Sequence, residues 1–266
     1  RPEREKSEFT AETEVIMIQP HRDDVPLSTG DLLAYLKAQK KQVKIVTVMT
    51  EANDQAQGRF PDIIRKQSSL PSVYFAQREV ENRQALEKLG VTANEQVPLG
   101  EIDAVFRTKK GTDAVLYPKV KGDRDKQDEA LVGKVAQKLR REAGLDEELQ
   151  SADKQKQKVV FVPMGVGNHI DHVLVRDAAL AAFKDEPNVT LVYYMDIPYA
   201  LEEENLAAEH VQSFITANSL QEAEFGGDVH NTYQRKKIDS IYKYRTELRH
   251  LFDNGNVTLP RTCVWM

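Results

Sequence analysis

The sequence lacks features that several classes of protein require. Its 266 residues contain one cysteine, Cys263, which excludes a disulfide within the chain and any cysteine-rich metal or redox motif. No apolar run approaches the roughly 18 residues that a membrane-spanning helix needs. Residues 1–14 also lack the apolar core of a secretory signal. We therefore expect a cytoplasmic protein with no membrane span.

An excess of basic residues is lacking too. Acidic residues number 42 and basic residues 37, so the formal net charge is -5 and provides no electrostatic footprint for nucleic acid. A chain of 266 residues, 40% of them hydrophobic, can bury one sizeable core. We expect one domain over residues 1–266, with residues 1–13 as a flexible N-terminal segment. The expected partner is a small-molecule substrate, and an oligomer is compatible with these features.

The sequence does contain a regular alternation of strand-like and helix-like segments. Runs rich in β-branched residues predict strands over residues 15–19, 43–49, 97–99, 159–164 and 189–195. Helical spacing of apolar residues predicts helices over residues 28–40, 71–89, 125–141, 170–183 and 232–252. The polar stretch 51–70 is predicted to be a long loop, and 142–158 a charged connector. The alternation predicts an α/β fold with a Rossmann-like, mostly parallel sheet and helices on both faces.

Two polar clusters follow predicted strands. The sequence HRDD at residues 21–24 comes directly after the first strand, and GNHIDH at residues 167–172 follows the strand at 159–164. Asn168 is the expected N-cap of the helix that begins beside it. Because ligands of such sheets bind beyond the carboxyl ends of the strands, we expect the two clusters to form one site.

The residue types in these clusters suit a catalytic metal centre. Two histidines and one carboxylate are a known ligand set for zinc, and they leave a coordination position for water. Zinc lowers the pKa of that water to roughly 7, and a second carboxylate can accept its proton. Another histidine can polarise the substrate carbonyl or protonate the leaving amine. The resulting assignment is His21, Asp24 and His172 as metal ligands, Asp23 as general base, and His169 as electrophile or acid.

Two further expectations concern the surroundings of the metal. Asp171 is expected to accept a hydrogen bond from a histidine ring N–H beside it. Zinc is the expected ion, although the same ligand types also accept Fe²⁺, cobalt or manganese. Each cluster alone has a simpler interpretation, since a pair of aspartates is usually a turn and a His-x-x-His pair is often an exposed helix face. Three of the chain's six histidines lie in the two clusters, which favours a metal site.

Together these residues resemble the PIG-L/LmbE deacetylases, whose motifs are Ala/Pro-His-Pro-Asp-Asp-Glu and His-x-Asp-His. The first motif reads PHRDDV at residues 20–25, and the second is intact as HIDH at residues 169–172. Further similarity extends over residues 15–252 and includes an Arg-x-x-Glu helix that contains Arg78. The resemblance implies an LmbE-like fold and a zinc-dependent N-deacetylase that acts on an N-acetylglucosamine-type conjugate. It also implies that Arg78 and Asp103 contact the hydroxyl groups of the sugar.

Both of these contact residues have simpler interpretations. Arg78 is then an exposed residue that pairs with Glu79 or Glu81, and Asp103 is a turn residue. Tyrosines at residues 193, 194 and 199 could likewise stack on a sugar, but packing is the simpler interpretation.

Three positions depart from the family pattern. Arg22 replaces a proline, and its charge is expected to favour ionised Asp23 and so to weaken this base. Val25 replaces a glutamate and removes a carboxylate near the metal. Gly167 stands where some relatives carry a tyrosine that helps to stabilise the transition state, which leaves more of this work to His169.

The expected reaction is hydrolysis of an N-acetyl group from an amino-sugar conjugate, with Asp23 activating a zinc-bound water. A metal-dependent amidase that acts on a non-sugar or thiol-conjugate amide is the nearest alternative. An alternative of another class is a binding protein that kept the fold but lost turnover, which the changes at Arg22 and Val25 allow.

Overall fold

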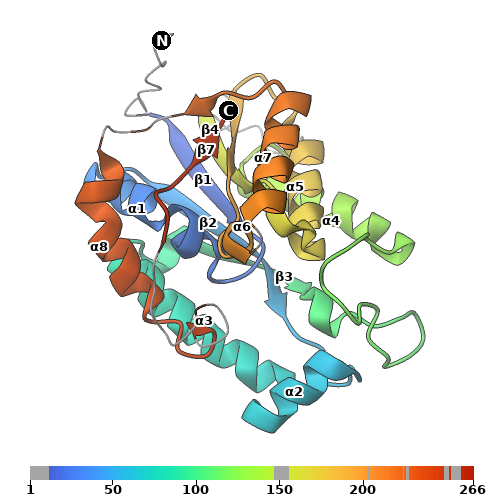
Figure 1. Ribbon diagram of the computed structural model, residues 1–266. Helices are drawn as coiled ribbons and strands as arrows, with labels where there is room; N and C mark the ends of the chain where they lie inside the picture. Colours follow the sequence, from blue (N-terminus) through green and yellow to red (C-terminus); the bar gives the residue numbers. More distant parts are fainter. Residues whose placement is uncertain are drawn as a thin grey trace.

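The computed structural model describes residues 12–146, 156–202, 204–223, 225, 228–248, 252 and 259–266. Within these residues the centre is one sheet with the strand order β3-β2-β1-β4-β5-β7-β6 (Figure 1). The strands are β1 (Glu14–Gln19), β2 (Val43–Glu51), β3 (Gln96–Ile102), β4 (Lys158–Pro163), β5 (Val189–Tyr194), β6 (Glu222–Ala223) and β7 (Val264–Trp265). The predicted flexible segment 1–13 and the charged connector 142–158 lie largely outside the described residues.

The first five strands are parallel, as the alternation of strands and helices predicts. β1 pairs with β2 on one side and with β4 on the other, while β3 and β5 extend the sheet beyond them. β7 runs antiparallel to β5, and β6 runs antiparallel to β7. These two strands were not predicted because each has only two residues, which is too short for an alternating pattern.

Helices cover both faces of the sheet (Figure 1). α1 (Asp24–Ala38), α3 (Pro71–Lys88) and α8 (Val229–Ile241) lie on one face, and α4 (Glu129–Glu142), α5 (Ile170–Phe183) and α7 (Glu204–Ala217) lie on the other. Short helices, namely α2 (Arg59–Ser68), α6 (Tyr199–Glu202), η1 (Ala93–Glu95), η2 (Ala104–Phe106), η3 (Lys126–Asp128) and η5 (Val166–Asn168), lie in the connections. No helix in the described part of the chain is long and apolar enough to cross a membrane. The predicted fold class is confirmed.

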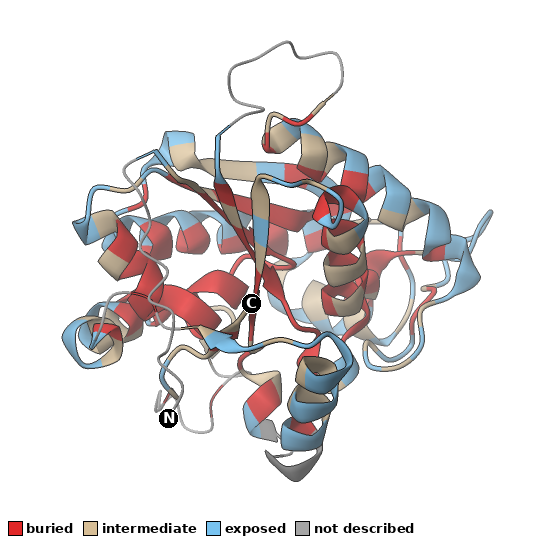
Figure 2. Cartoon of the chain, turned by 90° about the horizontal axis from the view of Figure 1, so that it is seen from above, coloured by how far each residue is buried: buried red, intermediate tan, exposed pale blue. Residues whose placement is uncertain are grey.

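The side chains of β1 alternate between two apolar cores. Ile16 and Ile18 belong to the cluster beneath α4 and α5, whereas Val15 and Met17 belong to the cluster beneath α1 and α3. Buried residues gather along the central strands, and exposed residues lie on the outer faces of the helices (Figure 2). Because both faces of β1 are covered, its register is strongly specified, and so is the position of the turn that follows it.

The order of the strands creates a crevice between β1 and β4. From β1 the chain continues outward through β2 and β3, and it then returns to the other side of β1 as β4. The connections after β1 and β4 therefore leave in opposite directions. Ligands of open parallel sheets bind at such a point, beyond the carboxyl ends of the strands. The clusters at residues 21–24 and 167–172 follow these two strands, so the fold places them at one crevice.

Two predictions about helices were wrong, and one helix was missed. The stretch 51–70 is not a structureless loop, because it contains the amphipathic helix α2, whose apolar residues are outnumbered by polar ones. Helix α7 was not predicted at all. The predicted helix 232–252 is not continuous: α8 ends at Ile241 and residues 242–247 are not helical, and there the Tyr244 hydroxyl donates to the carbonyl of Arg22 over 2.9 Å. That break depends on tertiary contacts, which helical periodicity cannot reveal.

Candidate metal centre and substrate pocket

The first polar cluster forms the turn from β1 into α1. The helix begins at Asp24, earlier than the predicted start at residue 28, and Asp23 is its N-cap residue. The backbone N–H of His21 donates to Asp24 Oδ2 over 2.6 Å, which ties the two ends of the turn together. Both aspartates therefore stand at the N-terminus of α1, where the helix dipole favours negative charge.

The second cluster forms the turn from β4 through η5 into α5. His169, not Asn168, is the N-cap of α5: its Nδ1 accepts the backbone N–H of Asp171 over 3.2 Å. Burial lowers the pKa of His169 well below its ordinary value, and the charges of His21 and His172 lower it further. The ring is therefore neutral, and because Nδ1 is an acceptor, its proton resides on Nε2.

Two overlapping sets of side chains could hold a metal ion. One set is His21, Asp24 and His172, which are the predicted ligands, and the other is His21, His169 and Asp171. In each set the potential ligand atoms lie within 4.8 Å of one another, and every residue is buried. In the first set, Asp24 Oδ2 lies 3.4 Å from His21 Nδ1, and Asp24 Oδ1 lies 3.3 Å from His172 Nε2.

The hydrogen bonds of Asp171 favour the first set. Its Oδ2 accepts the backbone N–H of Ala104 over 2.9 Å and lies 3.1 Å from His21 Nε2, while its Oδ1 accepts from Arg107 over 2.6 Å. Burial would raise the pKa of Asp171, but Arg107 and His21 hold it well below its ordinary value. Both oxygens are thus engaged by protein donors. The contact with the His21 ring is the one predicted for Asp171 from the sequence.

His172 gives the clearest test of whether these residues fit a metal ion. Its Nδ1 lies 2.5 Å from Asp196 Oδ1, while its buried Nε2 lies 3.3 Å from Asp24 Oδ1 without forming a hydrogen bond to it or to any other group in the described part of the chain. Asp196 also accepts the backbone N–H groups of Gly165 and Val166, over 2.8 and 2.9 Å. A carboxylate on one ring nitrogen fixes the tautomer and directs the other nitrogen toward a metal. A buried nitrogen without a partner is costly unless a ligand occupies it, so the residues fit a metal ion.

The charges of the site point to the same conclusion. Burial would lower the pKa of His172, but the carboxylates of Asp24 and Asp196 raise it to about 9. The pKa of His21 is likewise raised well above its ordinary value, because Asp103, Asp171 and Asp24 outweigh its burial. Protons on these rings compensate the negative charge of the carboxylates, and a divalent cation bound in their place would compensate the same charge.

Asp23 lies beside the candidate ligands and is held by Arg78. The guanidinium donates to Asp23 Oδ1 over 3.2 Å, and its Nε lies 3.4 Å from Glu247 Oε1. Arg78 is only 9% exposed, so the simpler interpretation of an exposed arginine paired with Glu79 or Glu81 is wrong. The helix α3 thus brings a buried cation to the predicted base.

The protonation of Asp23 differs from what its neighbour Arg22 led us to expect. Burial raises the pKa of Asp23, and the charge of Arg78 offsets this only in part. The Arg22 guanidinium turns away, donates to the carbonyl of Thr50 over 3.0 Å and lies over the ring of Phe75. The predicted weakening of the base by Arg22 was therefore wrong, because the cation beside Asp23 is Arg78.

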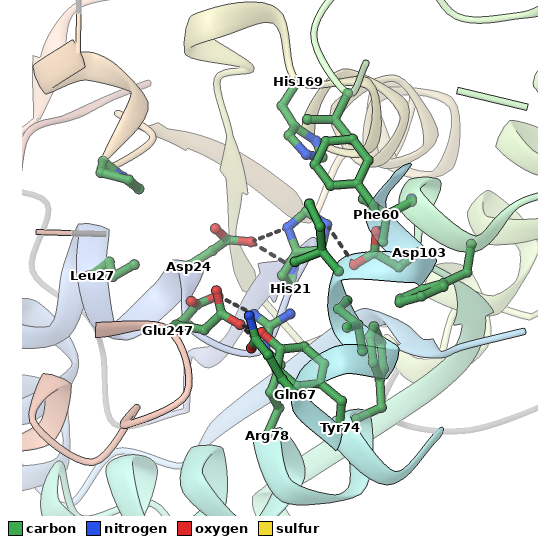
Figure 3. A pocket seen from close by; sticks show the side chains of 18 of the residues that line it. His21, Asp24, Leu27, Phe60, Gln67, Tyr74, Arg78, Asp103, His169 and Glu247 are labelled. Carbon is green, nitrogen blue, oxygen red and sulfur yellow. Dashed lines mark hydrogen bonds and ion pairs between the residues drawn. The ribbon is translucent and has the colours of Figure 1, made fainter. Parts of the chain in front are cut away.

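A pocket of about 390 Å³ opens over these residues (Figure 3). Its polar lining residues are His21, Asp23, Asp24, Gln67, Arg78, Asp103, His169 and Glu247. We call His21, Asp23, Asp24 and His169 the polar floor. Asp103 Oδ2 lies 3.6 Å from His21 Nε2, while Asp103 Oδ1 accepts the backbone N–H of Val105, so this residue is both a turn residue and a part of the pocket. His172 and Asp171 lie fully buried beneath the floor.

The glycine that replaces a tyrosine in the second cluster has a steric reason. Gly167 has a φ of 79°, and a Cβ there would lie 2.7 Å from the Cβ of Tyr199. The Tyr199 ring instead approaches the site from α6, with its centroid 5.5 Å from that of His169 and 5.0 Å from that of His172. An aromatic ring is thus present beside both histidines, although it comes from another segment. Simple packing was the interpretation favoured for Tyr199 from its sequence context.

Sequence reasoning missed three residues of the candidate site. Asp196 follows β5, so the rule that places ligands at strand ends could have found it. Arg107 lies in a stretch without a repeating pattern, and its Nε lies 2.8 Å from Asp128 Oδ2. Glu247 lines the pocket from the turn after α8 and accepts from the Tyr74 hydroxyl, and burial raises its pKa to about 8. No local signal distinguished the last two residues.

Comparisons with known proteins agree with this geometry. The model of the family described as PIG-L: GlcNAc-PI de-N-acetylase matches residues 16–183, which contain both polar clusters. A 2'-N-acetylparomamine deacetylase of Streptomyces fradiae is 28% identical over 200 residues, which are 75% of this chain and 62% of that protein. The chain thus spans less than two thirds of that relative. A 2'-N-acetylparomamine deacetylase of Niallia circulans is 25% identical over 279 residues, 94% of this chain and 90% of that protein.

A solved structure supports the fold. The zinc-inhibited form of a teicoplanin deacetylase matches with a TM-score of 0.67 at 22% identity, and the match covers 92% of this chain and 88% of that one. At this level of identity the likeness bears on the arrangement of strands and helices, and it agrees with the LmbE-like architecture expected from the sequence.

Proposed function

Because the chain belongs to the PIG-L family of GlcNAc-PI de-N-acetylases, we propose that it is a metal-dependent hydrolase that removes an N-acetyl group from an amino-sugar conjugate. The observation that carries the proposal is the His172 ring, which Asp196 holds at Nδ1 and which has no hydrogen-bond partner at Nε2, beside Asp24 and His21. Both curated relatives are named as deacetylases of an N-acetylated compound, which supports the N-acetyl group as the target.

The proposed metal ligands are His21, Asp24 and His172, and zinc is the proposed ion. When bound, the ion supplies Lewis-acid polarisation of an amide carbonyl and lowers the pKa of water. Asp196 orients the His172 ring through Nδ1, and Asp171 orients the His21 ring through Nε2. These carboxylates hold the rings in place before any substrate arrives.

Asp23 is the proposed general base. Its raised pKa, which burial causes, strengthens it as a proton acceptor, and the hydrogen bond from Arg78 holds one oxygen in place. Asp23 takes a proton from the attacking water as the new C–O bond of acetate forms. The amide C–N bond then breaks, and the same proton passes to the leaving nitrogen, so the products are acetate and a free amine.

His169 is proposed to stabilise the developing oxyanion. Its neutral ring carries the proton on Nε2, and His169 lines the pocket. Because the lowered pKa leaves the ring neutral, His169 has no extra proton to give to the amine, but its Nε2–H can donate a hydrogen bond to the amide oxygen. Of the two roles considered for His169, the electrophile therefore has the better support.

Arg78 and Asp103 are proposed to contact sugar hydroxyl groups. Both line the pocket, one from α3 and the other from the turn after β3. A guanidinium offers only donors and a carboxylate only acceptors, so together they match a hydroxyl group, which is both.

The test is the substitution Asp23→Ala in zinc-loaded protein, with an N-acetylglucosamine conjugate as substrate and acetate release as the measurement. The zinc content should stay at the wild-type level, while kcat should fall by about 10²- to 10⁴-fold. Glu79→Ala is the matched control, because that carboxylate is 66% exposed and lies outside the pocket. Full activity of zinc-loaded Asp23→Ala would refute the mechanism.

A further inference from the structure

One side of the pocket is formed by helix α2. Phe60, Ile63, Ile64 and Gln67 line the pocket at helical spacing, so one stripe of this helix faces the cavity. We call Phe60, Ile63 and Ile64 the apolar wall. The opposite surface of α2 carries polar residues such as Asp62. The amphipathic pattern of α2 is thus directed at the pocket.

The apolar wall does not suit the hydroxyl groups of a sugar. The side chains of Ile63 and Ile64 offer neither donors nor acceptors, and a hydroxyl group that leaves water without a hydrogen-bond partner loses affinity. The polar lining residues belong mainly to other elements, and α2 contributes only Gln67 to them. Helix α2 therefore contributes a mainly apolar surface to the pocket, whereas the groups that suit the amide and the sugar come mainly from other elements.

The packing of α2 leaves part of this wall uncovered. Ile64 packs against a small apolar cluster that includes Phe75 and Phe106, whereas Ile63 remains 40% exposed. Pro61 is the one residue of α2 that is buried, so the helix packs only lightly on the rest of the protein. An exposed isoleucine at the edge of a pocket gains stability when an apolar group covers it. Because the wall and the polar floor line one cavity, a ligand of that cavity can reach both surfaces (Figure 3).

We propose that the substrate carries an apolar chain or ring that packs against the apolar wall while its N-acyl amide group lies on the polar floor. This inference rests on the proposed function and adds a class of substrate to it. The apolar group has two chemical sources, namely an aglycone on the sugar or an acyl chain longer than acetyl on the nitrogen. Both present methylene groups that cannot hydrogen-bond, which is the chemistry that the wall matches.

The first experiment compares substrates on the zinc-loaded protein. The kcat/KM for octyl N-acetylglucosaminide is measured against that for the methyl glycoside, and N-octanoylglucosamine is measured against N-acetylglucosamine. Each methylene group that leaves water contributes roughly a threefold to fourfold gain, so one of the two octyl compounds should be preferred at least about tenfold. The pair that shows the preference identifies the source. Equal kcat/KM within both pairs would overturn the inference and leave the deacetylase proposal intact.

The variant Ile63→Ser tests the wall itself. It should reduce the octyl preference severalfold, because a hydroxyl group replaces an exposed aliphatic side chain on the wall. Val73→Ser is the matched control, since Val73 is 50% exposed on the neighbouring helix α3 and does not line the pocket. A preference that survives Ile63→Ser unchanged, or that falls equally in Val73→Ser, would contradict the assignment to α2.

A binding measurement separates this inference from the proposed function. Octyl glucoside has no amide, so its binding below the micelle concentration, followed by calorimetry, does not depend on turnover. It should bind the wild type several times more tightly than it binds Ile63→Ser, even if no N-acetyl compound is hydrolysed. The same samples are examined by sedimentation. If Ile63→Ser dissociates a dimer of the wild type and leaves octyl glucoside binding unchanged, the wall is a contact between two copies and the inference fails.

Discussion

The polar floor and the apolar wall face the same cavity, but they are held in opposite ways. The residues of the floor come from the turns directly after β1 and β4, and each is 7% exposed or less. The wall lies on α2, a helix inserted between β2 and β3, in which Pro61 is the buried residue. One surface is fixed by the central sheet, and the other is attached at its periphery.

The difference indicates how the two tasks of the site are divided. Catalytic groups must keep their geometry to within a fraction of an ångström, and for the proposed catalytic residues of the floor the hydrogen bonds of Asp171 and Asp196 would provide this support. A wall that recognises a substrate by apolar contact needs shape more than precise direction. Substitutions in α2 should therefore change which compounds bind, whereas substitutions beneath the floor should change whether the site works at all.

The largest effect is expected from His172→Ala. This change removes a proposed ligand from beneath the floor, so purified protein should lose its zinc on dialysis and lose deacetylase activity with it. The metal-to-protein ratio measured by atomic absorption is the readout, and Ile63→Ser should retain the wild-type ratio. A full equivalent of zinc in His172→Ala would instead favour His21, His169 and Asp171 as the ligand set.

The next effect concerns pH. Metal binding requires the neutral form of His172, whose pKa is about 9 in the metal-free protein. Below that pH protons compete with the metal, so zinc affinity should rise about tenfold per pH unit for each displaced proton between pH 6.5 and 8.5. The folding stability of the metal-free protein should depend on pH in the opposite direction. The raised pKa of His172 contributes to the free energy of unfolding in full below pH 6.5, and this contribution is lost as the pH rises toward 9. Competition with a chelator at several pH values measures the affinity, and a flat profile would contradict the site.

A smaller effect is expected from Asp196→Asn. The amide keeps the shape of the side chain but lacks the negative charge and has only one acceptor oxygen, so it orients the His172 ring less well. Zinc affinity should therefore fall by about 10- to 100-fold. Asp177→Asn on α5 is the matched control, because its carboxylate is 30% exposed and pairs with Arg124 away from the pocket. Equal zinc affinities in the two variants would show that Asp196 does not act on the metal site.

The smallest effect is expected for the stability of the apolar wall. Ile63→Ser should change the free energy of unfolding by no more than about 0.5 kcal/mol, as is usual for exposed positions. Ile18→Val, a change in a fully buried residue of β1, should cost about 1 kcal/mol although it removes only one methyl group. Urea denaturation of both variants measures the difference. A larger loss in Ile63→Ser would mean that the wall is part of the core.

The sequence predicted those parts of the fold whose signals are local. The apolar runs at 15–19 and 43–49 became β1 and β2, and the helix 170–183 became α5, because periodicity and burial agree over these segments. The rule that ligands bind beyond the carboxyl ends of the strands predicted that the two polar clusters form one site. Their order in the chain alone does not predict this.

Other parts depend on contacts between distant segments. Arg78 is buried among groups that are distant in the sequence, namely Asp23 from the turn after β1 and Glu247 from the turn after α8, and without these contacts the surface-pair interpretation was reasonable. Helix α2 was missed because its apolar residues are few and serve the pocket instead of the core. The orienting role of Asp196 needed the distance to His172, which no pattern of residues supplies.

The pairing of β1 with β4 has a consequence for the time at which the metal can be bound. His21 and Asp171 lie 150 positions apart in the chain, yet their side chains touch. A ribosome releases the first half of the site long before the second, and contacts of such separation form late in folding. A nascent chain that ends before β4 has the carboxylates of the first turn but lacks His172. With the proposed ligands, tight metal binding would therefore require a molecule whose synthesis has passed α5 and whose central sheet has closed.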